Sequence, residues 1–246
     1  MKNIDLNADM GESYGRYRLG QDEQLMPLLT SCNIACGFHA GDPLTIKKTI
    51  ALALEHKVKV GAHPSYPDLM GFGRRRMHLS AEELTAAIAY QISAIKGLVE
   101  SQGGHLHHVK PHGALNNHMM EDPSVLHVVL EAVRSFDPAL ITYVPFARDL
   151  PQDQPIWIEV FADRTYEDDL QLTPRSVPGS LLDDLDGASA HLEQLIVGGQ
   201  LRSRGGKSFK VDYQTVCIHG DNPAAVPIAK WIHQQAAQSE ISLVSQ

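Results

Sequence analysis

The chain has 246 residues, 43% of them hydrophobic, and a formal net charge of -8 at pH 7. This length suits one large α/β barrel, and we expect residues 1–246 to form a single domain. The negative charge argues against a nucleic-acid or membrane partner, and no apolar run reaches the roughly 18 residues that a membrane span needs. Three cysteines, an odd number, and the lack of a secretory signal pattern lead us to expect a cytoplasmic protein without a disulfide scaffold.

The first predicted strand, 3–9, alternates polar and apolar residues. Asp5, Asn7 and Asp9 share one face, and apolar side chains occupy the other. A polar inner face costs free energy unless its groups are paired or used in function. Glu12 lies in the turn that follows, so this strand end supplies two carboxylates.

The next two predicted strands end in histidine. Residues 31–39 alternate in the same way and place His39 at the end of the face that carries small residues. Asp42 precedes a proline and is expected to cap the helix that follows. Strand 57–63 ends in His63, so two imidazoles are expected at neighbouring strand ends.

A Gly- and Pro-rich loop with an arginine run separates the third strand from the fourth. Arg74 and Arg75 belong to this run, which is either a solvated surface or a clamp for a carboxylate or phosphate. A long helix with a capping-box start follows the loop. Strand 105–112 then places Lys110 and His112 on one face.

The second half of the chain adds further ionisable groups at strand ends. Asp163 and Arg164 follow the sixth predicted strand, and a polar loop beyond them carries Arg175. The last predicted strand ends in His219, with Asp221 two residues further on. Asp221 also has a plausible capping role, because a helix begins directly after it.

Strands and helices alternate along the chain, which is typical of a parallel sheet. The predicted strands are 3–9, 31–39, 57–63, 105–112, 140–146, 156–161 and 213–219. The predicted helices are 22–29, 43–56, 80–102, 123–136, 189–197 and 223–237. Small or polar inner faces favour a closed barrel, and no Gly-x-Gly-x-x-Gly follows the first strand. We therefore predict an α/β barrel of seven units with its catalytic groups at the carboxyl ends of the strands.

Two patterns do not indicate separate chemistry. Gly205–Ser208 resembles the end of a phosphate loop, but Leu201 stands where that pattern needs a glycine, and an extended segment follows. Alternation along the last predicted strand places Cys217 on the inner face of the barrel. The sequence places no base next to it, so a thiol nucleophile is not favoured.

A metal site is an open alternative. Asp9, His39 and His63 come from neighbouring strands and would supply a two-histidine, one-carboxylate set. No linear spacing such as H-E-x-x-H supports it. Proton transfer by the same imidazoles is equally compatible with the pattern.

Seven motifs of the chain resemble those of the LamB/YcsF family. They are Asp5–Glu12, Asn33–Pro43, Gly61–Pro64, Gly71–Arg75, Val109–Leu115, Phe161–Arg164 and His219–Pro223. The resemblance covers nearly the whole chain. One departure is Asn116, which stands where the family usually has tyrosine.

The resemblance implies a fold and an activity. The fold would be a distorted (β/α)7 TIM-like barrel, similar to the glycoside hydrolase/deacetylase superfamily. Members of the family are A subunits of bacterial ATP-dependent 5-oxoprolinase, which converts 5-oxo-L-proline, ATP and water to L-glutamate, ADP and phosphate. Activity in the family requires subunits B and C. Where ATP binds is left open.

Together, the strand ends and the resemblance give two sets of candidate site residues. The catalytic candidates are Asp9, Glu12, His39, His63, Lys110, His112, Asp163 and His219. The candidates for binding substrate or phosphate are Asn7, Asn33, Arg74, Arg75, Arg164, Arg175 and Asp221. Two other functions remain as alternatives: a metal-dependent amide or sugar deacetylase that acts alone, and a non-catalytic subunit that binds partners.

Overall fold

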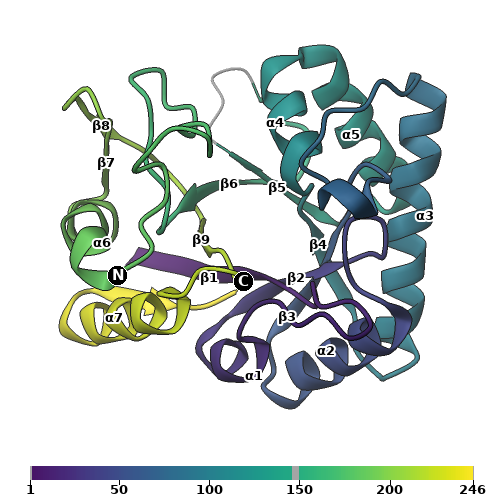
Figure 1. Cartoon of the computed structure of the whole chain (residues 1–246), viewed down its shortest axis with the longest axis horizontal. Coiled ribbons are helices and arrows are strands. Elements are labelled where there is room, and N and C mark those ends of the chain that lie inside the picture. Colours follow the sequence, from purple (N-terminus) through teal and green to yellow (C-terminus); the bar gives the residue numbers. More distant parts are fainter. Residues whose placement is uncertain (1, 146–149, 246) are drawn as a thin grey trace.

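Seven parallel strands close into a barrel in the computed structural model of the chain, which describes residues 2–145 and 150–245 (Figure 1). In order around the barrel they are β1 (Lys2–Met10), β2 (Ser31–Ala35), β3 (Lys59–His63), β4 (Leu106–Val109), β5 (Ile141–Pro145), β6 (Ile156–Phe161) and β9 (Thr215–Ile218). Closure comes from parallel pairing of β9 with both β6 and β1. The predicted barrel of seven strands is therefore confirmed.

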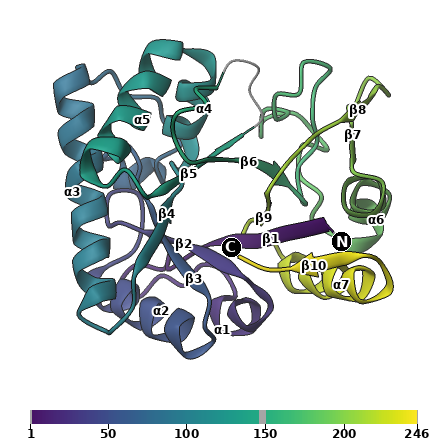
Figure 2. The same ribbon diagram turned by 180° about the vertical axis from the view of Figure 1, so that it is seen from behind.

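Three short strands lie outside the barrel. β10 (Ile241–Leu243) pairs in parallel with the start of β1, as Figure 2 shows, and β7 (Gln200–Arg202) forms an antiparallel hairpin with β8 (Ser208–Lys210). Each has three residues, too few to show a periodic signal in the sequence. Gly205–Ser208 forms the hairpin turn and enters β8, with no helix directly after it, in agreement with its rejection as a phosphate loop.

Helices surround the barrel, with α6 and α7 on one side and α3 and α5 on the other (Figures 1 and 2). The α-helices are α1 (Asp22–Leu25), α2 (Pro43–Glu55), α3 (Ala81–Glu100), α4 (Gly113–Glu121), α5 (Pro123–Phe136), α6 (Leu185–Leu192) and α7 (Ala225–Gln238). Short 3₁₀ helices span Met26–Leu28 and Leu69–Gly71, and a π-helical turn, Glu193–Val197, extends α6. Within the described ranges, no helix has both the length and the apolar character needed to cross a membrane.

Helix starts follow the local capping signals. The carboxylate of Asp42 accepts the backbone N–H groups of Leu44 and Thr45 at the start of α2. Ser80 and Glu83 form a reciprocal capping box at the start of α3. These contacts need only neighbouring residues, which is why the sequence predicts them.

Several boundaries differ from the predictions. β2 ends at Ala35 because Gly37 adopts a positive φ of 87°, so His39 lies in a bend and not in the strand. β4 ends at Val109, and the nine-residue α4, which was not predicted, begins four residues later. The weak apolar periodicity of α4 and its Gly113 start, at a φ of 53°, hide it in the sequence. The last residue of the predicted strand 140–146 lies outside the described residues.

The two faces of the barrel strands have opposite character. Outward-facing residues such as Ile4 and Leu6 are fully buried in the apolar layer between strands and helices. The interior is polar: Asp5 accepts side-chain hydrogen bonds from Ser31 (2.7 Å), Tyr143 (3.1 Å) and Thr215 (2.6 Å). Pairing of this kind offsets the free-energy cost of burying a carboxylate.

Candidate active site

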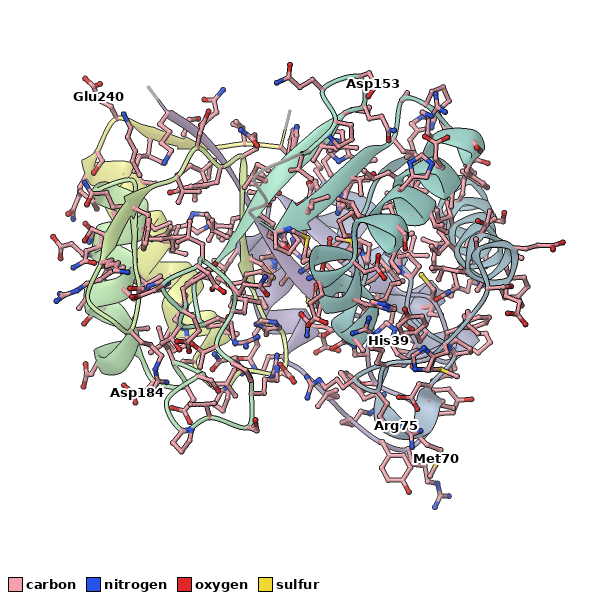
Figure 3. The ribbon with its side chains drawn as sticks, turned by 90° about the horizontal axis from the view of Figure 1, so that it is seen from above. His39, Met70, Arg75, Asp153, Asp184 and Glu240 are labelled. Atoms are coloured by element: carbon pink, nitrogen blue, oxygen red, sulfur yellow. The ribbon has the colours of Figure 1, made fainter. Side chains whose placement is uncertain are left out.

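A cavity of about 910 Å³ opens at the carboxyl ends of the barrel strands. Its walls include Asp9 from β1, His63 from β3, Lys110 after β4 and His219 after β9. The barrel thus brings together strand ends that are far apart in the sequence. Figure 3 shows His39 near this end of the barrel.

Lys110 is the centre of a buried charge cluster. Its Nζ donates to Asp9 Oδ1 (2.8 Å) and Cys217 Sγ (3.0 Å) and lies 3.1 Å from Glu159 Oε1. Burial alone would lower the pKa of Lys110, but the Asp9 carboxylate and its other neighbours raise it well above the usual value. Burial raises the pKa of Cys217, so its thiol stays protonated. Lys110 is therefore a fixed cation and not a base.

Asp9 lies between Lys110 and the imidazoles. Its Oδ2 is 3.3 Å from His63 Nε2. Burial alone would raise the pKa of Asp9, but His63 and Lys110 hold it well below the usual value. Asp9 is therefore ionised at neutral pH.

Glu159 was not a candidate in the sequence, although its parity in β6 placed it on the inner face. Burial raises its pKa, and its Oε2 has no hydrogen-bond partner among the described residues.

Asn7 and Asn33 lie beneath the cavity and do not line it. Asn33 Nδ2 donates to Asp9 Oδ1 (2.9 Å) and Asn7 Oδ1 (2.7 Å). Asn7 Nδ2 in turn donates to Glu159 Oε1 (3.0 Å). The two amides, which the sequence predicted to bind substrate, are hydrogen-bonded to the carboxylates that surround Lys110.

Three imidazoles and two carboxylates meet at one end of the cavity, where Asp9, Glu12, His63 and His112 line it and His39 packs behind them. His39 Nε2 is 3.2 Å from Glu12 Oε1, and His112 Nδ1 is 3.0 Å from His63 Nε2. The rings of His39 and His112 stack at 3.8 Å. Burial lowers the pKa of His39 and His112 well below the usual value. Burial, and then the charge of Asp9, raises the pKa of Glu12 to about 8.

Glu12, His39, His63 and His112 could hold a metal ion, because one ligand atom of each lies within 4.8 Å of the others.

The loop after β3 covers the imidazoles. The ring of Phe72 contacts His39 and His112 edge-on, and its carbonyl oxygen accepts from His112 Nε2 (2.9 Å). A Cβ atom on Gly73 would lie 2.8 Å from His112 and 2.9 Å from His39, so only glycine fits there. The Gly-rich sequence of this loop therefore serves close packing over the site.

Asp163 and His219 form a second ionisable pair. His219 Nδ1 lies 2.8 Å from Asp163 Oδ1, and Asn222 Nδ2 donates to Asp163 Oδ2 (2.9 Å). Burial alone would raise the pKa of Asp163, but His219 lowers it below the usual value. Asp163 is fully buried and does not line the cavity, so it positions His219, which does.

Arginines form the opposite wall of the cavity. Arg74, Arg164 and Arg175 line it. Arg74 pairs with Asp221 (3.0 Å), whereas Arg164 donates only to two backbone carbonyl oxygens. Burial, and then the neighbouring Arg175, lowers the pKa of Arg164 to about 10. The guanidinium of Arg175 has no hydrogen bond or ion pair with any described residue, so it is available to bind an anion in the cavity.

Arg75 lies apart from the cavity. It pairs with Asp68 on the protruding loop after β3, where Figure 3 shows it pointing outward near Met70. Its side chain is 68% exposed, and it is not among the lining residues. Asn116, at the family's tyrosine position, does line the cavity, and its buried Oδ1 has no partner among the described residues.

Comparison with known proteins identifies relatives that match nearly the whole length of the chain. The A subunit of 5-oxoprolinase from Geobacillus thermodenitrificans is 47% identical over 245 residues, which are 98% of this chain and 95% of that protein. The crystal structure of a "Lactam Utilization Protein" from Thermus thermophilus matches with a TM-score of 0.89 and 39% identity over 100% of both chains.

The barrel itself has more distant relatives. A family 4 carbohydrate esterase from Streptomyces lividans aligns with a TM-score of 0.51 and 12% identity over 98% of this chain and 91% of that one, which shows a shared fold alone. The model of the LamB/YcsF family matches residues 4–246. This chain therefore belongs to the LamB/YcsF family, and its full-length homologues include 5-oxoprolinase A subunits.

Proposed function

We propose that this chain is the A subunit of an ATP-dependent 5-oxoprolinase. The enzyme would open 5-oxo-L-proline to L-glutamate while ATP is hydrolysed to ADP and phosphate. The observation that carries the proposal is the 47% identity to the A subunit of a 5-oxoprolinase over nearly the full length of both proteins. The cavity is compatible with it, since one wall suits an anion and the other offers a buried cation beside imidazoles and carboxylates.

The need for ATP follows from the chemistry of the substrate. Amide resonance protects the lactam carbonyl against water. Transfer of the terminal phosphoryl group of ATP to the lactam oxygen would release ADP and make the ring carbon a better electrophile. Water could then add to that carbon, and the C–N bond would break with the ring nitrogen leaving as the amine, which gives an acyl phosphate. Hydrolysis of this acyl phosphate by a second water molecule would release phosphate and leave L-glutamate.

We assign Lys110 to the oxygen on which negative charge develops. A buried ammonium that stays protonated stabilises such charge electrostatically. Its partner Asp9 lies 2.8 Å away and is ionised, so it can accept a hydrogen bond from the attacking water and orient it. Lys110 and Asp9, which are in direct contact, would thus act on the same carbonyl group.

We assign the arginine wall to the anionic groups of the reactants. Arg164 and Arg175 have no carboxylate partner in the described part of the chain, and guanidinium groups bind carboxylate and phosphate oxygens in a bidentate manner. The carboxylate of 5-oxo-L-proline and the phosphoryl group being transferred are the two candidate ligands. His219, held by Asp163, would supply a proton to the leaving nitrogen.

Subunits B and C complete the enzyme in this proposal. The relatives are named as A subunits, which implies further subunits. The sequence has no phosphate loop, and we propose that one of the other two subunits contributes part of the ATP site.

The test is glutamate release from 5-oxo-L-proline by the purified chain with subunits B and C. We expect glutamate and phosphate in equal amounts, and only when ATP and all three proteins are present. Glutamate formation by B and C alone would overturn the proposal. Hydrolysis of an acetylated sugar by this chain alone would favour the deacetylase alternative instead.

A further inference from the structure

We infer that the cavity floor binds one divalent transition-metal ion. Its protein ligands would be one carboxylate and three imidazoles, from Glu12, His39, His63 and His112. The role of the ion in catalysis, though not the site itself, rests on the proposed function.

The first line of support is the tautomer of each ring. His63 Nδ1 lies 2.6 Å from the carbonyl oxygen of Lys110, and His112 Nε2 lies 2.9 Å from that of Phe72. A carbonyl oxygen only accepts, so both of these nitrogens carry hydrogen. In the neutral rings, His63 Nε2 and His112 Nδ1 therefore present lone pairs, and these two atoms face each other at 3.0 Å.

The same reasoning fixes the third imidazole. Ser65 donates its hydroxyl hydrogen to the carbonyl oxygen of Tyr66 (2.8 Å), so its oxygen accepts from His39 Nδ1 (3.0 Å). His39 Nε2 is then the lone-pair nitrogen, and it faces Glu12 Oε1 at 3.2 Å. Hydrogen bonding of the second ring nitrogen to an oxygen acceptor is the usual arrangement of metal-bound histidine.

The resulting cluster directs only acceptors toward its centre. Three lone-pair nitrogens and a carboxylate oxygen cannot face one another stably without a cation between them. Two protons could supply this positive charge. One would lie on His63, shared with Asp9 and His112, and the other would lie between Glu12 and His39. A divalent ion replaces both and binds all four groups at once.

The charges around the cluster also favour a metal. Lys110 is already shared by Asp9 and Glu159. Among residues 2–145 and 150–245, Glu12 forms ion pairs only with His39 and His112 and with no Lys or Arg. His39 and His112 are both buried, and burial in the protein interior disfavours the charged form of an imidazole. A metal ion would balance Glu12 without charging an imidazole.

The ligand types indicate which ion. Three imidazoles and one carboxylate suit Zn²⁺, Co²⁺ or Ni²⁺, whereas Mg²⁺ and Ca²⁺ prefer oxygen ligands. Asp9, a candidate ligand in the sequence, has one carboxylate oxygen bonded to Lys110, so we assign it to the edge of the site. An ion here would lie beside Lys110, where it could polarise the lactam carbonyl or hold a water molecule.

The test measures binding to the purified protein, without subunits B or C. The protein is treated with chelator and titrated with Zn²⁺, Co²⁺ and Mg²⁺, and bound metal is measured by elemental analysis. We expect about one Zn²⁺ or Co²⁺ per chain, a visible Co²⁺ absorption band typical of nitrogen ligands, and no comparable binding of Mg²⁺. Absence of stoichiometric Zn²⁺ and Co²⁺ binding would mean that protons alone occupy the cluster, and the inference would fail.

Three variants locate the ion. His39→Asn and Glu12→Gln should each weaken Co²⁺ binding by at least about tenfold. His219→Asn is the matched control, since it lines the same cavity outside the cluster and should bind Co²⁺ as the wild type does. An equal loss of Co²⁺ binding in all three variants would overturn the assignment of the metal site. If the cluster variants do not fold, the Co²⁺ spectrum of the wild type still decides.

The metal and the proposed function can fail separately. Glutamate release by a complex that binds no metal would overturn the metal site and leave the proposed function intact. Stoichiometric metal binding without glutamate release in the presence of ATP, B and C would support the metal site and overturn the proposed function.

Discussion

The polar interior of the barrel and the cavity above it contain similar side chains. The two regions differ in how the free-energy cost of burying these polar groups is compensated. In the interior, Asp5 accepts hydrogen bonds from four side-chain hydroxyl groups. Of the described residues, three buried side-chain polar atoms lack a partner, and two of them, on Asn116 and Glu159, lie in or beside the cavity. None belongs to the layer around Asp5.

This difference separates structural from functional burial. Where polar groups are buried for structural reasons, their hydrogen bonds are made to one another, and no donor or acceptor is left for a ligand. Around the cavity, by contrast, neither Arg175 nor Glu12 forms an ion pair with a Lys, Arg, Asp or Glu side chain in the described part of the chain. A ligand that supplies the missing charge is the simplest explanation of such a site. The predictions below test this contrast, from the largest expected effect to the smallest.

Replacement of Lys110 by Met should have the largest effect. It removes the fixed cation from the cavity, and we expect turnover to fall by roughly 10³-fold in the complex with B and C. Because Asp9 and Glu159 lose their partner, the melting temperature should fall as well. Lys96→Met is the control, since Lys96 pairs only at the helix surface. Near wild-type glutamate release by a folded Lys110→Met protein would exclude Lys110 from the chemistry.

Replacement of Arg175 by Gln should raise KM more than it lowers kcat. The guanidinium has no protein partner among the described residues, so its removal costs little stability and weakens anion binding by roughly 10- to 100-fold. Initial rates at varied 5-oxo-L-proline and ATP would show which reactant it holds. Arg75→Gln removes an exposed arginine outside the cavity and should leave both constants unchanged. If Arg175→Gln and Arg75→Gln change KM and kcat equally, the assignment of Arg175 to anion binding in the cavity is wrong.

Replacement of Asp5 by Asn tests the interior. The amide group would place a donor against hydroxyl donors, and we expect a loss of about 2–4 kcal/mol in the free energy of unfolding. Urea denaturation would measure it, with the exposed Asp186→Asn as control. If turnover at low temperature fell while stability was retained, Asp5 would belong to the functional region instead.

The Asp163–His219 pair predicts a small pH effect. The pKa of Asp163 is below its usual value of 3.8 in the folded protein, so the unfolded chain binds the proton more readily. The stability that Asp163 contributes is therefore present above pH 3.8 and is lost as the pH falls through its folded value. Below pH 3.8, the free energy of unfolding should fall more steeply in the wild type than in Asp163→Asn, by up to about 1.4 kcal/mol per pH unit. Parallel urea titration curves for the two proteins would contradict this.

The sequence by itself determined the presence of the seven barrel strands, several helix caps and the ionisable groups near the strand ends. Alternation along 3–9, the cap at Asp42 and the capping box at Ser80 each depend on residues a few positions apart. Such local signals survive without knowledge of the fold. The seven units of the barrel followed from them, and so did the inward parity of Lys110.

Only the tertiary structure decided which side chains meet. Asp9 and Lys110 are 101 positions apart, and their contact depends on barrel closure and register. Strand parity did not explain the position of His39, which packs against His63 and His112 from a bend after β2. It also could not show that Arg75 turns outward while Arg175 lines the cavity. Side-chain pairing at long range is set by packing and charge balance in three dimensions, and no local pattern in the chain records it.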